Sequence, residues 1–321
     1  MSRVRQEVNR KWTADDLVRE GTRRFRRSRV FFGHGTDNAR DEAAWLVSHA
    51  LGCAVDQLPQ RRLKPVPPAT AERILRLFSR RITERQPAAY LTREAWLGDV
   101  RFYVDERVIV PRSHIAPLLQ ERLHPWIGRA GRIRSVLDLC TGSGCLAILA
   151  ARAFSRARVE ASDISASALA VAKRNVAAFR LGRRIRLVRS DLFAKLRRGR
   201  YDLILCNPPY VTASSMRRLP PEYRHEPALA LAGGPDGLSL VRRILAQSRA
   251  HLNPGGLLVL EIGRGRARME RAFPGLRFIW PDVHEKHAVC IVEREMLGTY
   301  GRGSSSEMKS SRTRCGVSSR N

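Results

Sequence analysis

The sequence of 321 residues contains no uninterrupted apolar run of about 18 residues, the minimum that a membrane-spanning helix needs. Its first residues, MSRVRQEVNRKW, lack the apolar core of a secretory signal peptide. We therefore expect no membrane span and a cytoplasmic location.

Paired cysteines are also missing. The six cysteines include no CxxC pair, and most of them lie in apolar segments. Cysteines in such segments are far more often small buried thiols than disulfides or zinc ligands, so we expect neither a disulfide nor a zinc site. We interpret the cysteines as small buried thiols, including Cys140 and Cys145 on either side of a glycine-containing loop.

Acidic residues are scarce. The chain has 30 aspartates and glutamates against 59 lysines and arginines, which gives a formal net charge of +29. Such a charge attracts polyanions and makes association depend on salt. Two explanations of this charge stay open: the protein acts on a target rich in RNA, or the whole chain simply has an arginine-rich composition.

Residues 12–90 predict a small helical bundle. Thr13 and Asp16 have the spacing of a capping box before an apolar run. Asp41 can cap a second helix, and a proline-rich break separates that helix from a third. Residues 96–110 alternate β-forming and polar side chains, which predicts a hairpin.

From residue 133 onward, short apolar strands alternate with helices. The expected strands are 134–139, 159–162, 186–188, 201–205, 257–262, 277–280 and 288–293, and the clearest helices are 166–179 and 238–252. This alternation predicts an α/β fold with a doubly wound, mostly parallel sheet. The last twenty or so residues are rich in serine, glycine and arginine, which predicts a disordered tail.

A glycine loop follows the first of these strands. Gly142 and Gly144 allow the backbone to approach a ligand closely at a helix N-terminus. No Gly-Lys-Ser/Thr follows, which excludes a phosphate-binding P-loop. A dinucleotide-binding fingerprint stays open for this loop alone, because Ala147 is a permitted variant at its last position.

Three carboxylates occur at the ends of successive strands. Asp138 can bind an ammonium group, which adenosylmethionine has and NAD lacks. Asp163 can accept hydrogen bonds from two ribose hydroxyls, and Asp191 can accept one from the adenine amino group. Each of them alone fits a helix cap or loop residue equally well. Their order along the chain favours S-adenosyl-L-methionine as the cofactor.

The motif Asn207-Pro208-Pro209-Tyr210 ends the fourth predicted strand, at the edge where ligands of open α/β sheets bind. The Asn207 side-chain oxygen and the Pro208 carbonyl can accept the two hydrogens of a planar amide or ring amino group. Tyr210 can pack on that planar group. Positioning the nitrogen in line with the methyl group supplies much of the acceleration and requires no metal.

DLCTGSG, the acidic end of the second strand and NPPY together resemble the HemK-like family of protein-glutamine methyltransferases. The last motif also resembles amino-methylating DNA enzymes. PAAYLT from Pro87, VPRS from Val110 and LPPEYRHEPALAL from Leu219 are similar to the PrmB-type branch of the family. The similarity runs from about residue 15 to about residue 297.

The resemblance implies a Rossmann-like class I methyltransferase fold with a small N-terminal helical domain. The expected parts are a substrate-docking helical domain over 1–92, a β-hairpin linker over 93–112, an S-adenosylmethionine-dependent methyltransferase domain over 113–298 and a disordered basic tail over 299–321.

The resemblance also implies site residues. Besides Asp138 and Asp191, the cofactor site would be lined by Cys140, Thr141, Gly142, Ser143, Gly144, Asp163, Leu192 and Asn207. The target glutamine would be held by Asn207, Pro208, Pro209 and Tyr210, of which Asn207, Pro208 and Tyr210 are the catalytic candidates. Arg224, His225 and Glu226 would either contact substrate or brace the loop after Tyr210, and Glu261 is interpreted as structural.

The PrmB-type branch modifies a large-subunit ribosomal protein, L(3), so we expect that protein as the partner. Incidental contact with ribosomal RNA through the basic surface stays open, and no membrane partner is expected. The alternatives are the release-factor branch and an amino-methylase of DNA or RNA bases. Cys140 and Leu192 depart from the release-factor branch, which usually has glycine and an aromatic residue at these positions.

Overall fold

The computed structural model describes residues 11–128, 130–196, 201–283 and 288–300, and it divides into two compact units. The first unit comprises the chain up to Arg112 together with Ser214–Leu231, and the second comprises Ser113–Ala213 and the chain from Ala232 onward. A segment that closely follows NPPY in sequence therefore belongs to the helical unit. The predicted tail lies outside the described residues, apart from its first two, which belong to α14 (Leu297–Tyr300).

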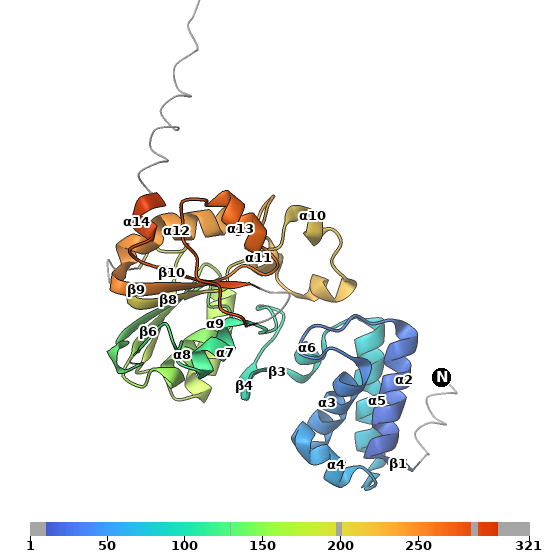
Figure 1. The fold of residues 1–321 in the computed structure, drawn as a ribbon. Helices are drawn as coiled ribbons and strands as arrows, with labels where there is room; N and C mark the ends of the chain where they lie inside the picture. Colours follow the sequence, from blue (N-terminus) through green and yellow to red (C-terminus); the bar gives the residue numbers. More distant parts are fainter. Residues whose placement is uncertain (1–10, 129, 197–200, 284–287, 301–321) are drawn as a thin grey trace, which may run out of the picture. The chain divides into compact units, whose positions relative to one another are not determined.

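Three helices pack together in the first unit, as predicted: α2 (Ala14–Ser28), α3 (Ala39–Leu51) and α5 (Pro68–Thr83) (Figure 1). The shorter elements of this unit are β1 (Trp12–Thr13), η1 (Val55–Gln57), α4 (Leu58–Arg61), β2 (Pro65–Val66), α6 (Ala88–Thr92), η3 (Pro221–His225) and α11 (Ala228–Leu231), and α10 (Ala213–Met216) begins at the junction of the two units.

The capping box at the start of α2 is confirmed. The Thr13 hydroxyl accepts a hydrogen bond from the Asp16 N–H at 3.1 Å, and the Asp16 carboxylate accepts one from the Thr13 N–H at 3.1 Å. The predicted cap of α3 is wrong. Asn38 caps that helix, because its side-chain oxygen accepts from the N–H groups of Arg40 and Asp41.

The predicted hairpin forms but is shorter than expected. It consists of β3 (Glu94–Leu97) and β4 (Val100–Tyr103), paired antiparallel. The strand ends after Tyr103 because the Asp105 side chain accepts a hydrogen bond from the Arg107 N–H at 3.1 Å, which favours a turn over continued pairing.

A six-stranded sheet organises the second unit in the order β10-β9-β8-β5-β6-β7. Every neighbouring pair is parallel except β10 with β9, so the predicted doubly wound, mostly parallel sheet is confirmed. The strands are β5 (Ser135–Leu139), β6 (Arg158–Asp163), β7 (Ile185–Arg189), β8 (Tyr201–Cys206), β9 (Leu252–Glu261) and β10 (Val289–Glu293).

One predicted strand does not form. Residues 277–280 contribute only an isolated bridge, in which Ile279 faces Ile291 of β10. β10 pairs with β9 over Leu257–Glu261 and forms the edge of the sheet, so 277–280 lies at that outer edge beside β10.

Helices cover both faces of this sheet. Figure 1 shows α7 (Ile115–Gln120), α8 (Cys145–Ala153) and α9 (Ala166–Ala178) on one face, and α12 (Ser239–His251), α13 (Arg266–Ala272) and α14 on the other. The short helix η2 (Ala130–Arg132) precedes β5. Strands buried on both faces are apolar throughout, which explains why β8 and β9 carry continuous apolar runs.

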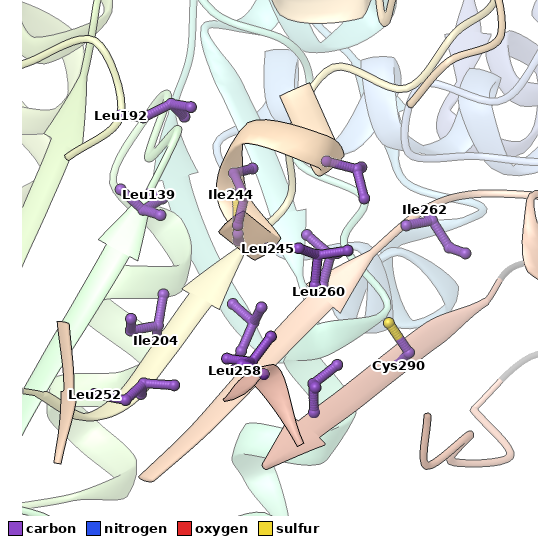
Figure 2. Packing of buried hydrophobic residues seen from close by; sticks show 14 of the residues in the cluster. Leu139, Leu192, Ile204, Ile244, Leu245, Leu252, Leu258, Leu260, Ile262 and Cys290 are labelled. Carbon is purple, nitrogen blue, oxygen red and sulfur yellow. The ribbon is translucent and has the colours of Figure 1, made fainter. Parts of the chain in front are cut away.

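The core on the α12 side is built from the strands next to the glycine loop. Figure 2 shows Ile244 and Leu245 of α12 packed over Leu258 and Leu260 of β9, with Ile204 of β8 nearby. All five side chains are buried. This packing holds the ends of β8 and β9 in a defined position, which matters for the site below. No helix among the described residues is both long enough and apolar enough to cross a bilayer.

Candidate active site

The register of the sheet brings three strand ends together. Leu139 of β5 lies opposite Ser162 of β6 and Cys206 of β8. The residues that follow these strands therefore meet at one edge of the sheet. From β5 the chain adds β6 and β7 on one side and then β8 and β9 on the other, so the strand order reverses at β5. Ligands of open α/β sheets bind at this kind of edge. Asp163 and Asn207 consequently lie on either side of the glycine loop.

Asp138 lies one residue before the end of β5 and is 1% exposed. Its Oδ2 accepts hydrogen bonds from the Thr141 hydroxyl at 2.5 Å and from the Ala147 N–H at 3.0 Å. Its Oδ1 has no partner among the described residues. Burial raises the pKa of Asp138 to about 7. A buried acceptor without a donor fits the ammonium group of adenosylmethionine, which would supply both a donor and a positive charge.

The glycine loop has the backbone conformation that its glycines allow. Gly142 and Gly144 have φ of +54° and +80°, in the left-handed region that favours glycine. No atom lies within 4 Å of the position that a Cβ on Gly142 would take, so the space above it is open. A Cβ on Gly144 would lie 3.2 Å from the Ala172 Cβ, so that glycine serves packing against α9.

Hydrogen bonds of the other loop residues hold the turn in its conformation. Thr141 donates its N–H to the Ser162 carbonyl at 3.0 Å, while the Ser143 carbonyl accepts from the Asn175 amide at 2.9 Å. Cys140 also adopts a left-handed conformation, with φ of 57°. Its thiol is only half-buried, so the predicted buried thiol is wrong for Cys140, whereas Cys145 is buried as predicted.

Asp163 ends β6 and faces the loop. Its Oδ2 accepts from the Gly142 N–H at 2.9 Å, and its Oδ1 accepts from the Ser165 N–H at 2.9 Å. Burial raises the pKa of this carboxyl. Each carboxylate oxygen has a second lone pair, so both can also accept from the hydroxyls of a ribose.

Asp191 and Leu192, which follow β7, have different surroundings. Asp191 is exposed and pairs with Arg243 of α12 at 2.8 Å. The Leu192 side chain is buried in the core beside Leu139 (Figure 2). The backbone of Leu192 is left-handed, with φ of 47°. A contact of Leu192 with a ligand would therefore involve its backbone.

The NPPY motif begins directly after β8. Asn207 is half-buried, and no described residue hydrogen-bonds to its side chain, whereas Pro208 and Pro209 are buried. Tyr210 is closely surrounded by glycines: a Cβ on Gly233 would lie 2.6 Å from the Tyr210 Cα, and one on Gly263 would lie 2.7 Å from its ring. These glycines are required because the Tyr210 backbone and ring occupy the space of their missing side chains.

Glu261, which the sequence suggests is structural, has partners that the sequence does not reveal. It ends β9, next to Asn207 in the register, and is 1% exposed. Its Oε1 accepts from the Tyr210 hydroxyl at 3.4 Å, and its Oε2 accepts from the Ser113 hydroxyl at 2.5 Å and the His114 N–H at 3.0 Å. Glu261 thus orients Tyr210. The sequence feature that indicates such a role is a polar residue at the end of an apolar strand, next to the strand that carries NPPY.

Glu226 braces the segment after Tyr210. It is 4% exposed, and its two oxygens accept from the two Arg112 nitrogens at 2.6 and 2.7 Å. Burial raises its pKa, but Arg112, His34 and the Val110 N–H together outweigh burial and hold the pKa of Glu226 below its ordinary value. His225 lies on the outside of the segment and contacts the Glu84 carbonyl at 2.9 Å through Nε2. The bracing interpretation of Glu226 therefore fits its surroundings.

Comparison with known proteins identifies the family. The model of the methyltransferase small domain matches residues 118–219, and that of the PrmC N-terminal domain matches residues 16–92. The ribosomal protein uL3 glutamine methyltransferase of Bordetella pertussis is 52% identical over 92% of this chain and 98% of its own length. The enzyme of the same name from Neisseria meningitidis serogroup B is 49% identical over 89% of this chain and 94% of its own length.

Solved structures are more distant. The catalytic domain of hMettl16 is 16% identical and has a TM-score of 0.47, over 70% of this chain and 81% of that domain. The curated relatives decide the assignment, because their identity extends through both units. The chain is a methyltransferase and belongs to the family of ribosomal protein uL3 glutamine methyltransferases.

Proposed function

We propose that this chain transfers a methyl group from S-adenosyl-L-methionine to the side-chain amide nitrogen of a glutamine in the large-subunit ribosomal protein uL3. The names of its relatives support the protein and the residue type. The single observation that carries the chemistry is the position of Asn207-Pro208-Pro209-Tyr210, at the end of β8 and beside the Asp138–Gly144 loop.

The cofactor end of the site would use groups that are already oriented. Oδ1 of Asp138 would accept from the ammonium group, and Asp163 would accept from the ribose hydroxyls. The remaining members of this end are Cys140, Thr141, Gly142, Ser143, Gly144, Asp191 and Leu192. When bound, S-adenosyl-L-methionine supplies the methyl group from a positively charged sulfonium.

The acceptor end would hold the target amide by its two hydrogens. The Asn207 side-chain oxygen and the Pro208 carbonyl would accept them, which aims the nitrogen lone pair at the neighbouring methyl group. Pro209 lacks an N–H and keeps the turn rigid. Tyr210 would pack against the planar amide in the orientation set by Glu261.

Ribosomal RNA is the second partner that we propose. The formal net charge of +29 gives a sequence-independent attraction to RNA, and a ribosomal protein is presented next to RNA when it is in a ribosomal particle.

Labelled S-adenosyl-L-methionine tests the proposal. The enzyme is incubated with large-subunit particles, free ribosomal proteins, release factors and RNA, and the label is located by mass spectrometry. We expect it on one glutamine of uL3. Label on a release factor would move the chain to the sister branch, and label on RNA bases would replace glutamine with a nucleobase.

Asn207→Ala provides the matched inactive variant. We expect methyl transfer to fall by about 100-fold or more, because the target nitrogen loses one of the two acceptors that position it. Binding of S-adenosyl-L-methionine, measured by titration calorimetry, should stay close to that of the unaltered protein. A variant that no longer bound the cofactor would assign Asn207 to the cofactor rather than to the acceptor.

A further inference from the structure

A groove rich in arginine lies in the helical unit, and none of the residues that line it is assigned to methyl transfer. It is an open groove of about 610 Å³ along α2 and the first turn of α3. Its charged lining consists of Arg19, Arg23, Arg26, Arg27 and Arg40, with Asp15 as the only acidic residue. We call these five arginines the arginine groove.

Most of this positive charge is not neutralised. Arg19 pairs with Asp15, and Arg23 pairs with Glu20 at 2.7 Å. The side chains of Arg26, Arg27 and Arg40 are exposed, and the part of the chain that the structure describes contains no ion-pair partner for them. Three guanidinium groups are therefore available to an external anion. Arg26 and Arg27 also lie in the last turn of α2, where cations are favoured by the helix dipole.

The spacing of the arginines fits a repeating anion better than a single one. Arg19, Arg23 and Arg27 are four residues apart on α2, so they lie on one helix face, about 6 Å from one to the next along the axis. Arg19 and Arg23 are exposed and their ion pairs contribute little to stability, so both can exchange a carboxylate for a phosphate. A guanidinium group donates two parallel hydrogen bonds to a phosphate. The residues that line the groove include no aromatic side chain, so they offer no aromatic ring on which a base can stack.

We infer that the arginine groove binds the phosphate backbone of RNA without reading its sequence. Phosphate contacts fix the position of a protein on RNA, and base contacts are needed for sequence specificity. An RNA backbone presents the row of charges that α2 matches. The inference rests on the proposed function only for the source of the RNA, which would be the ribosomal particle that carries the target protein.

Fluorescence anisotropy with a labelled RNA hairpin of arbitrary sequence tests the inference on the full chain without cofactor. The variant Arg26→Gln/Arg27→Gln/Arg40→Gln removes the unpaired charges. The matched control Arg152→Gln/Arg156→Gln/Arg271→Gln removes the same charge from exposed arginines of the second unit. Circular dichroism checks that both variants remain folded.

We expect the groove variant to bind RNA at least about tenfold more weakly at moderate salt. Its slope of log affinity against log salt concentration should fall by about two to three, one for each lost phosphate contact. The control should change affinity by less than about threefold. Equal losses in both variants would assign RNA binding to the overall charge and overturn the inference.

Two measurements keep the test decisive if the glutamine variant misfolds. Arg26→Lys/Arg27→Lys/Arg40→Lys keeps the charges, so its salt slope should match that of the unaltered protein. Polyglutamate should compete with RNA far less well than unlabelled RNA of equal charge, and equal competition would favour an acidic protein as partner. Binding of S-adenosyl-L-methionine should stay unchanged in the groove variant, and RNA binding is measured without cofactor, so failure here is distinct from failure of the proposed reaction.

Discussion

Asp138 and Glu261 are buried carboxylates on strands that flank β8, and their hydrogen bonds assign them different tasks. Glu261 has both oxygens engaged by groups of the chain itself. Asp138 keeps Oδ1 without a partner among the described residues. A buried acceptor is costly unless a donor reaches it, so Asp138 is suited to bind a ligand and Glu261 to orient a neighbour.

The raised pKa of Asp138 predicts how cofactor affinity depends on pH. Burial raises this pKa to about 7 in the free protein, whereas an ammonium group binds the ionised carboxylate. Below pH 7 the proton must leave before the ligand binds. The Kd of S-adenosyl-L-methionine should therefore rise as pH falls from 7 to 5.5, approaching tenfold per pH unit by linkage.

Calorimetry across that range measures the effect. Asp138→Asn is the control: it should bind the cofactor more weakly at pH 7 and show little change toward pH 5.5. A pH dependence that persists in Asp138→Asn would assign it to another group.

Tyr210→Phe tests whether Glu261 orients the ring. The variant removes only the hydroxyl that reaches Glu261, and a hydrogen bond of this kind contributes about 0.5–1.5 kcal/mol. We expect kcat to fall by roughly two- to tenfold with little change in the Kd of the cofactor. Tyr103→Phe is the matched control, because it removes a tyrosine hydroxyl bonded to Asp105 in the β3–β4 hairpin. Similar kcat values for both variants would contradict the orienting role.

At the scale of elements, the segment Ser214–Leu231 is held in the helical unit by two buried glutamates. Oε1 of Glu222 accepts from the Phe31 N–H at 2.9 Å and lies 3.4 Å from the buried Arg81. Glu226 accepts from the Val110 N–H at 2.9 Å as well as from Arg112. The segment begins four residues after Tyr210 in the sequence.

Glu226→Ala should destabilise the fold strongly. The substitution leaves the Arg112 guanidinium and the Val110 N–H without their buried acceptor, which costs about 3–5 kcal/mol. Urea unfolding followed by circular dichroism measures this loss. Glu270→Ala is the control, since it breaks the exposed Arg266–Glu270 pair of α13 and should cost at most about 1 kcal/mol. A cost for Glu226→Ala no larger than that of the control would refute the bracing role.

At the scale of the whole molecule, stability comes mainly from the apolar contacts between the sheet and its helices. Leu258 lies at the centre of β9 and is fully buried under α12 (Figure 2). The strands that carry the strand-end site residues are the same strands that form this core. Packing of the core and alignment of the site are therefore consequences of one sheet register.

Leu258→Ala should lower the free energy of unfolding by about 2–5 kcal/mol, because it removes buried methyl groups and leaves a cavity. Leu63→Ala is the matched control, since Leu63 is 70% exposed and its truncation should change stability by less than about 0.5 kcal/mol. Equal effects would mean that this part of the sheet does not limit stability.

Local patterns in the sequence determined most of the secondary structure of this protein and the placement of its strand-end residues. The Thr13 capping box, the alternation of strands and helices, and the placement of Asp163 and Asn207 at strand ends all follow from neighbouring residues. Such features are readable because helix capping, strand burial and turn formation depend on residues a few positions apart. The prediction was wrong for the cap of α3, because Asn38 accepts from the first N–H groups of that helix, and for the length of the hairpin, because Asp105 accepts from the Arg107 N–H and favours a turn.

Only the tertiary structure decided the partners of the polar side chains. Glu261 meets Tyr210 across 51 residues of sequence, and Glu226 meets Arg112 across 114. Asp191 pairs with Arg243, and the arginines of α2 and α3 gather into one groove. No local periodicity encodes these pairs, because they depend on which elements pack together and in which register. The sequence therefore determined that the methyl-transfer motifs lie at the ends of strands. The tertiary structure determined which buried side chains orient the residues of these motifs.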